Sequence, residues 1–139
     1  MILRKIKNIK RKIVFIGFIV FSFVVVVLFI LFQVVGMISN VIATGKQTEK
    51  IQDNLESAIS DVEIISVRST TGDSSGTGNH VDCLSKVEFT TELTIDEVEA
   101  AMSEYYDLDG DRCHIETGDE GYLFVLNTSA PFSGNIAGH

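Results

Sequence analysis

Residues 13–38, IVFIGFIVFSFVVVVLFILFQVVGMI, form a run of 26 residues without a charged side chain. At about 1.5 Å of rise per residue, a helix of this length measures roughly 39 Å and exceeds the ~30 Å hydrocarbon core of a bilayer. Lipid favours a helix because a helix gives every backbone amide an internal hydrogen-bond partner. The run therefore predicts a transmembrane helix over residues 13–38.

The sequences on the two sides of this run differ sharply in charge. Six of the eleven basic residues precede it, namely Arg4, Lys5, Lys7, Lys10, Arg11 and Lys12. All nineteen acidic residues lie from Glu49 onward with only five basic residues, a formal charge of −14. Basic residues beside a membrane span stay in the cytoplasm. We therefore expect residues 1–12 to be a cytoplasmic segment, with the C-terminal part outside the cell membrane.

A cleaved signal peptide is the alternative interpretation of the apolar run. The apolar stretch of a signal peptide usually has about 7–15 residues, and this run is longer. Ala43-Thr44-Gly45 nevertheless resembles a cleavage site, because small residues occupy it. The length of the run favours an uncleaved anchor.

Apolar residues continue at helical spacing beyond the run. Ile51, Leu55 and Ile59 fall on one stripe, which Ala58 and Val62 share and which Val41, Thr44 and Thr48 extend backwards. Charged residues occupy the other faces. The pattern predicts an amphipathic helical stalk over residues 39–61 that continues the membrane helix. Its apolar stripe is a candidate packing face for a protein partner or for self-association.

The remaining chain has the pattern of a small α+β domain over residues 62–130. Thr94 and Glu97 have the spacing of a capping box, which marks the start of a helix that should stop by Leu108. Alternating or β-branched stretches predict four strands, at residues 62–69, 81–89, 112–116 and 122–127. The glycine-rich segment 70–79 is expected to be a flexible loop, and residues 131–139 a loose tail. The expected order is α-β-β-α-β-β, with an antiparallel sheet.

The two cysteines, Cys83 and Cys113, both fall on core-facing positions of predicted strands. Outside the membrane a disulfide between them is permitted, and closing a loop of this length would contribute roughly 3–4 kcal/mol. The alternative is two buried free thiols that pack as small hydrophobic side chains. The sequence leaves both alternatives open.

The segment Asp107-Leu-Asp109-Gly110-Asp111 resembles part of a calcium loop, because it presents carboxylates at alternating positions. The EF-hand pattern needs Gly at loop position six and Glu at position twelve. Here Gly falls at position four and Gly118 at position twelve. A plain helix-to-strand turn also uses Asp and Gly. Asp107, Asp109 and Asp111 are thus a weak candidate metal site.

Catalytic motifs are not evident in the sequence, and no cofactor is expected. The three histidines are scattered, and His114 points to the opposite face of its strand from Cys113. Asn127-Thr-Ser matches a glycosylation sequon, a pattern that is frequent by chance. Nucleic acid is not an expected partner, since so acidic a surface repels phosphate.

In layout the chain resembles type IV pilins and the minor pilins of tight-adherence systems. These proteins have a basic leader, an apolar helix that continues as an amphipathic one, and an antiparallel sheet domain. Family processing follows a Gly, and Glu occupies the fifth mature position. The nearest match here is Gly17-Phe18, which places Ser22 where the family has Glu. The resemblance implies a subunit of a surface filament or secretion-type assembly.

Together these features predict a single-pass, membrane-anchored interaction or assembly module without catalytic activity. The bilayer is its first expected partner, and a protein bound through the helix is the second. A pilin-like subunit is the alternative hypothesis, and a weak calcium-binding domain is the third.

Overall fold

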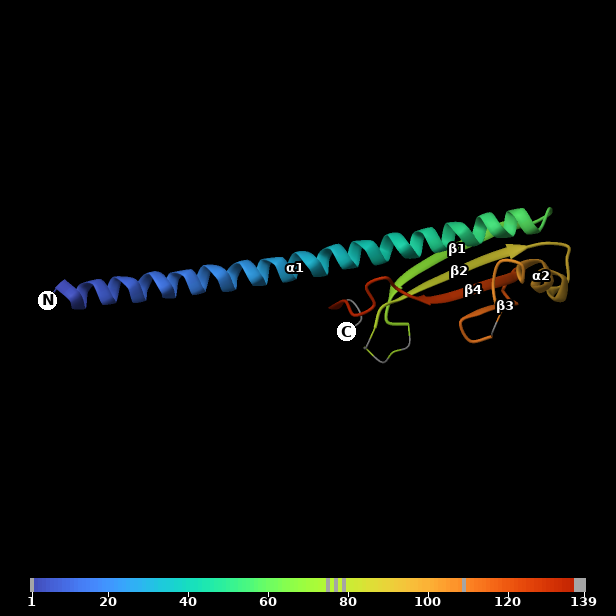
Figure 1. The fold of residues 1–139 in the computed structure, drawn as a ribbon. Coiled ribbons are helices and arrows are strands. Elements are labelled where there is room, and N and C mark those ends of the chain that lie inside the picture. The colour runs from blue at the N-terminus through green and yellow to red at the C-terminus, as the bar shows by residue number, and fades with distance from the viewer. Residues whose placement is uncertain (1, 75, 77, 79, 109, 137–139) are drawn as a thin grey trace. The chain divides into compact units, whose positions relative to one another are not determined.

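The structure, a computed structural model, describes residues 2–74, 76, 78, 80–108 and 110–136, with side chains from Ile6 onward. Along the chain the elements are α1 (Ile2–Ala58), β1 (Glu63–Gly72), β2 (Asp82–Thr90), α2 (Ile95–Met102), β3 (Cys113–Thr117) and β4 (Tyr122–Ser129) (Figure 1). The predicted α+β class and the element order are confirmed. The chain forms two compact units, Met1–Val35 and Gly36–His139.

The first unit consists of the N-terminal part of α1. Its most apolar 18-residue window has a mean hydropathy of 3.3, and none of that window is buried within the protein. Large side chains such as Phe18, Phe23 and Phe29 are more than half exposed. Soluble proteins rarely leave so large an apolar surface in water. By length and composition this helix is able to cross a membrane.

In the second unit the four strands form one antiparallel sheet in the order β1-β2-β4-β3. The central pair runs from Asp82 opposite Ser129 to Phe89 opposite Tyr122. β1 pairs along the other side of β2, with a register shift between Ile64 and Ser66 that leaves Ile65 as an extra residue. The connection from β2 to β3 contains α2, so these two strands need not be neighbours in the sheet. The final strand β4 is therefore able to lie between them.

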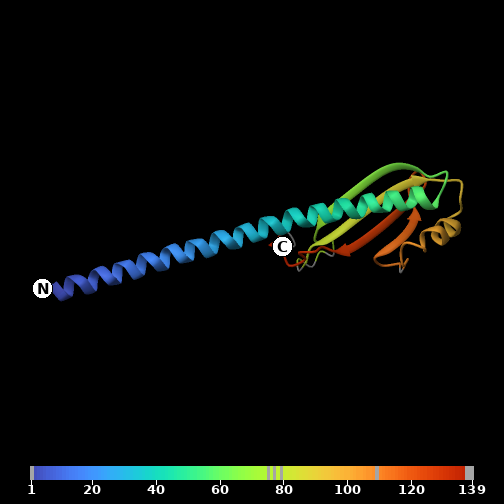
Figure 2. The same cartoon turned by 45° about the horizontal axis from the view of Figure 1, so that its top comes forward.

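One face of the sheet carries the hydrophobic core, as the alternating pattern of residues 81–89 predicted. Phe89 and Phe124 are fully buried, and ring contacts join Phe89 to Tyr122 and Phe124 to Tyr106 at centroid distances of 5.9 and 5.1 Å. The C-terminal half of α1 lies across this face (Figure 2). The core residues come from both helices and three strands, namely Ile51, Leu55, Ile59, Val87, Phe89, Val98, Met102, Cys113, Ile115 and Phe124.

Local hydrogen bonds fix the connections at one end of the sheet. After α1 ends, the carboxylate of Asp61 accepts hydrogen bonds from the Glu92 N–H at 2.6 Å and from the Thr91 hydroxyl at 2.9 Å. The predicted capping box is confirmed at the start of α2, where Glu97 Oε2 accepts from the Thr94 N–H at 2.9 Å. These bonds favour the ionised carboxylate. The Glu92 N–H and then the Thr91 hydroxyl lower the pKa of Asp61, and the backbone and hydroxyl of Thr94 lower the pKa of Glu97.

Two expected segment boundaries differ from those of the structure. The segment predicted as a stalk belongs to the folded unit that begins at Gly36, because one face of its helix is buried against the sheet. The tail expected to be loose is held as far as the structure describes it. Asn135 is 4% exposed, and Ser133 O accepts from the Val81 N–H at 2.8 Å. Residues 137–139 lie outside the described part of the chain.

The Asp61 contacts predict a pH-dependent contribution to stability. A carboxyl whose pKa is lower in the folded state stabilises the fold above its unfolded pKa, about 3.9 for Asp, and this contribution disappears as the pH falls through the folded pKa. We expect Asp61→Asn to lower the unfolding midpoint at neutral pH. The difference from wild type should shrink below about pH 4. Circular dichroism of the full chain in detergent measures both midpoints.

Thr91→Val is the matched control, because it removes one of the two donors and keeps the carboxyl. It should reproduce part of the Asp61→Asn effect. An Asp61→Asn profile that runs parallel to wild type from pH 7 to acid would contradict the argument.

Candidate functional site

Polar side chains dominate the contact between α1 and the sheet near the start of the second unit. The buried positions of α1 there are Gly36, Asn40, Thr44 and Thr48, spaced four residues apart. Residues at this spacing lie on one face of a helix. We call this contact the polar interface. It consists of Asn40, Thr44, Gln47 and Thr48 on α1, with Thr71, Cys83, Ser85, Leu126, Thr128 and Phe132 opposite them.

Gln47 hydrogen-bonds to four groups across the polar interface. Its Nε2 donates to Cys83 O at 3.0 Å, to Ser85 Oγ at 3.0 Å and to Leu126 O at 3.3 Å. Its Oε1 accepts a hydrogen bond from the Thr128 hydroxyl. One amide thus bonds to both central strands, β2 and β4, and fixes where the helix lies along them.

Hydroxyl pairs continue the interface on either side of Gln47. Thr48 Oγ1 lies 2.7 Å from Ser85 Oγ, and Thr44 Oγ1 lies 2.6 Å from Thr71 Oγ1. Thr44 and Thr48 also donate to backbone carbonyls one turn earlier in α1. Buried hydroxyls therefore have partners, which avoids the desolvation cost of unpaired polar groups.

Asn40 attaches the C-terminal tail to the helix. Its Nδ2 donates to Phe132 O at 3.0 Å, and its Oδ1 accepts from the Phe132 N–H at 2.9 Å. Gly36 lies one turn earlier, where an added Cβ would be 2.8 Å from Asn135 Nδ2. The absence of a side chain at Gly36 thus lets the tail approach the helix closely.

The stripe predicted on this helix is correct in its C-terminal part and wrong at Val41. Ile51, Leu55 and Ile59 are at most 1% exposed, as expected of a packing face, but they pack in the core of their own domain. Val41 is 60% exposed, and Asn40 occupies the packed position instead. Sequence reasoning missed Asn40 and Gln47 because polar residues on a helix usually face water. The sequence did carry one signal of this packed face, because small or polar residues recur at every fourth position from Gly36 to Thr48.

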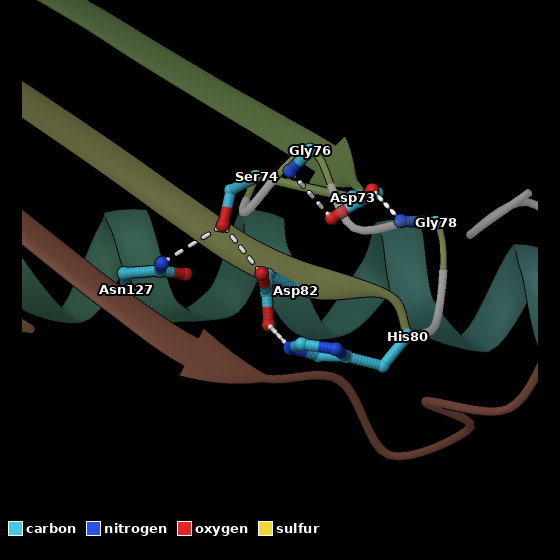
Figure 3. Close-up of polar contacts among 7 residues, drawn as sticks. All are labelled: Asp73, Ser74, Gly76, Gly78, His80, Asp82 and Asn127. Carbon is cyan, nitrogen blue, oxygen red and sulfur yellow. Dashed lines mark hydrogen bonds and ion pairs between the residues drawn. The ribbon is translucent and has the colours of Figure 1, made fainter.

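A second polar cluster lies where the 73–80 connection joins the sheet (Figure 3). Asp73 accepts hydrogen bonds from the Gly76 and Gly78 N–H groups, and both glycines have positive φ, which suits glycine. These bonds order the part of the predicted flexible loop that the structure describes.

Asp82 is 5% exposed and joins the cluster to the sheet. Its carboxylate accepts from the Ser74 hydroxyl, and His80 Nε2 lies 3.0 Å from Asp82 Oδ1. Ser, His and Asp are the residue types of a hydrolytic triad, but there the histidine lies between the other two. Here Asp82 occupies the middle position. The arrangement holds the loop to the sheet and does not present a serine to a histidine base.

Asn127, the sequon residue, also contributes to this cluster. Its Nδ2, the atom that a glycan would occupy, donates to Ser74 Oγ at 2.8 Å. Its backbone N–H donates to Arg112 O at 2.7 Å. The sequon therefore lies within a hydrogen-bonded strand, and its amide has a structural partner.

The two cysteines are free and buried, so the disulfide alternative is not realised. Cys83 lies on β2 and Cys113 on β3, and β4 runs between these strands. Strands two positions apart are separated by about 9–10 Å, whereas a disulfide requires a Cα separation below about 7 Å. Cys113 belongs to the main core and Cys83 to a small cluster with Val81 and Ala130.

The weak calcium candidate gains no support from the described residues. Asp107 and Asp111 are exposed in the connection from α2 to β3, and Asp109 lies outside the described part of the chain. Among the residues that the structure describes, no three His, Cys, Asp or Glu side chains gather as metal ligands. Gly110 has a φ of 84°, as a glycine in a turn often does.

The basic cluster lies on the first turns of α1. Lys7, Lys10, Arg11 and Lys12 are exposed there, while the side chains of Arg4 and Lys5 lie outside the described part. Uncharged side chains follow from Ile13 to Gly45.

Comparison with protein-family models, with curated proteins and with solved structures found no match to this chain.

The Gln47 contacts predict that a nonpolar replacement is costly. Gln47→Leu leaves two backbone carbonyls and the Thr128 hydroxyl without this partner, which should lower the free energy of unfolding by about 1–3 kcal/mol. The neighbouring exposed Lys46→Ala should change it by less than about 0.5 kcal/mol. Denaturant unfolding of the full chain in detergent gives both values. Equal stabilities of the two variants would contradict a structural role for Gln47.

Proposed function

We propose that this chain is a single-pass membrane protein whose acidic α+β domain lies outside the cytoplasm and works by binding a protein partner, without catalysis. One observation carries the proposal. The N-terminal half of α1 is uncharged from Ile13, and its apolar side chains are exposed along its whole length. A bilayer supplies the apolar surroundings that such a helix requires.

The proposed orientation comes from the charges on the two sides of the helix. Lys7, Lys10, Arg11 and Lys12 are exposed immediately before the span. The first basic residues after it are Lys46 and Lys50, within an otherwise acidic sequence. Positive charges beside a span resist translocation, so the N-terminus is assigned to the cytoplasm.

Binding is proposed in place of catalysis because the polar side chains of the two clusters hydrogen-bond to other groups of the fold. The polar interface and the cluster around Asp82 form hydrogen bonds within the fold. In that cluster the Ser74 hydroxyl donates to the Asp82 carboxylate, which also binds His80, so the serine is not presented to a histidine base as in a hydrolytic triad. The high negative charge favours a protein partner with a basic surface and disfavours nucleic acid.

Protease accessibility in right-side-out membrane vesicles tests the anchor and its orientation. External protease should digest the sheet domain and leave the N-terminal segment protected. Replacing all six basic residues before the span with Gln should yield chains of mixed orientation, because the charge bias is then lost; these residues are Arg4, Lys5, Lys7, Lys10, Arg11 and Lys12. The control, Lys46→Gln with Lys50→Gln, should keep the wild-type orientation.

The two parts of this proposal fail in different ways. Extraction of the protein by alkaline carbonate would contradict the anchor. A domain that stays protected from external protease while the chain remains in the membrane would contradict only the orientation.

A pilin-like subunit is the second candidate function. The observation that favours it is the architecture, in which a long N-terminal apolar helix packs against a four-stranded antiparallel sheet. In such a subunit the apolar part of α1 would pack against sister helices in a filament. Ser22 in place of the family's Glu and the position of Gly17 depart from the processing pattern.

N-terminal sequencing of the protein from its native membrane distinguishes the two functions. A filament subunit processed in the pilin manner should begin at Phe18, and a plain anchored module should begin at Met1. Finding the intact basic segment would contradict processing of the pilin type.

A further inference from the structure

The second unit exposes an apolar face on the part of α1 opposite to the polar interface. Met37, Ile38, Val41 and Ile42 are 40, 55, 60 and 53% exposed. These residues lie beside Asn40, whose side chain faces the tail. The helix here is therefore polar where it meets its own sheet and apolar where it meets its surroundings. This reverses the usual pattern of a surface helix.

The tail adds another apolar side chain at the same end of the domain. Asn40 binds Phe132 on both its N–H and its carbonyl, and Asn135 packs beside Gly36. These contacts fix the tail at the Gly36 end of the domain, on the side of α1 opposite to the apolar face, and Ile136, near its end, is 54% exposed. Figures 1 and 2 both place α2 at the opposite end of the sheet.

The length of the chain places this end of the domain at the edge of the bilayer. Residues 13–35 separate the last basic residue of the cluster from Gly36, where the folded unit begins. A membrane-spanning helix needs about 20 residues, so this segment suffices to cross and leaves almost none for a spacer. The face that starts at Met37 also continues the uncharged sequence of the span up to Gly45.

We propose that this end of the domain is seated in the headgroup layer, with Met37, Ile38, Val41, Ile42 and Ile136 in contact with lipid. The inference rests on the proposed membrane anchor and adds that the domain lies directly against the bilayer. Lipid is the occupant because the face is covalently continuous with the span and lacks charge. An apolar face of this kind gains free energy at the boundary between headgroups and acyl chains.

The acidic groups at this end are compatible with zwitterionic headgroups. Asp73 accepts two backbone N–H groups, and Asp82 is buried with His80 beside it. Their charges are thus engaged within the fold, although they would still disfavour strongly anionic lipids.

Tryptophan fluorescence tests the proposal directly, because the chain contains no tryptophan. Val41→Trp and Ile136→Trp each place a single reporter on the proposed contact. The full-length variants are reconstituted in phosphatidylcholine vesicles with and without acyl-brominated phosphatidylcholine, which quenches only nearby indoles. Both variants should lose emission, and by less than a reporter at the bilayer centre, since the interface is shallower.

Three further variants make each outcome decisive. Tyr105→Trp, 44% exposed and beyond α2 at the opposite end, should keep its full emission. Val25→Trp reports the span itself and should be quenched most. Circular dichroism checks that each variant keeps the wild-type fold, and Ile42→Trp repeats the measurement on the same helix face.

The outcomes separate this proposal from the anchor. If Val25→Trp is not quenched, the proposed anchor itself fails. If Val25→Trp is quenched while Val41→Trp, Ile42→Trp and Ile136→Trp keep the emission of Tyr105→Trp, the anchor stands and the seated domain is overturned. A blue-shifted but unquenched Val41→Trp would mean that protein, such as a second copy, covers this face, and it would overturn lipid contact as well.

Discussion

The packing of α1 residues 36–58 and the following Ile59 on the sheet is the interaction on which the folded unit depends. Without it, the inner face of the sheet would expose Val87, Phe89 and Phe124 to water. The helix covers this face with two different kinds of contact. Ile51, Leu55 and Ile59 contribute nonspecific apolar burial, while Gln47, Thr48 and Asn40 contribute hydrogen bonds that are satisfied in only one register.

The apolar contacts and the hydrogen bonds have different effects for a physical reason. Apolar contacts stabilise by area removed from water and tolerate small displacements along a helix. Buried amides and hydroxyls are costly when unpaired, so they admit only the placement in which each finds its partner. The polar interface therefore fixes the position of α1 on β2 and β4, and the tail with it. It also leaves the apolar residues of this helix segment on the outside, where the proposed lipid contact would cover them.

The same packing changes what the segment after the span is able to do. An exposed amphipathic stalk would offer Ile51, Leu55 and Ile59 to a partner, but in the structure these side chains are buried in their own domain. Any partner of the second unit must bind other surfaces. These are the acidic exterior, the open face of the sheet around Lys86 and Glu88, or the outward face of α1.

The sequence by itself determined the features that depend on local pattern. Lipid acts on each side chain of a continuous stretch, so the run from Ile13 to Ile38 was sufficient to predict a helix able to span a bilayer. Alternation in residues 81–89 and the Thr94–Glu97 pair were sufficient to predict a half-buried strand and a helix start.

Only the tertiary structure decided the features that depend on strand order. The insertion of β4 between β2 and β3 separates Cys83 from Cys113, and local sequence does not encode that pairing. The partners of Asn40 and Gln47 lie far along the chain, at Phe132 and in β2 and β4. Such polar residues are indistinguishable from solvent-facing ones until the chain brings their partners to them. For this reason the boundary at Gly36, the docked tail and the outward apolar face emerged only from the fold.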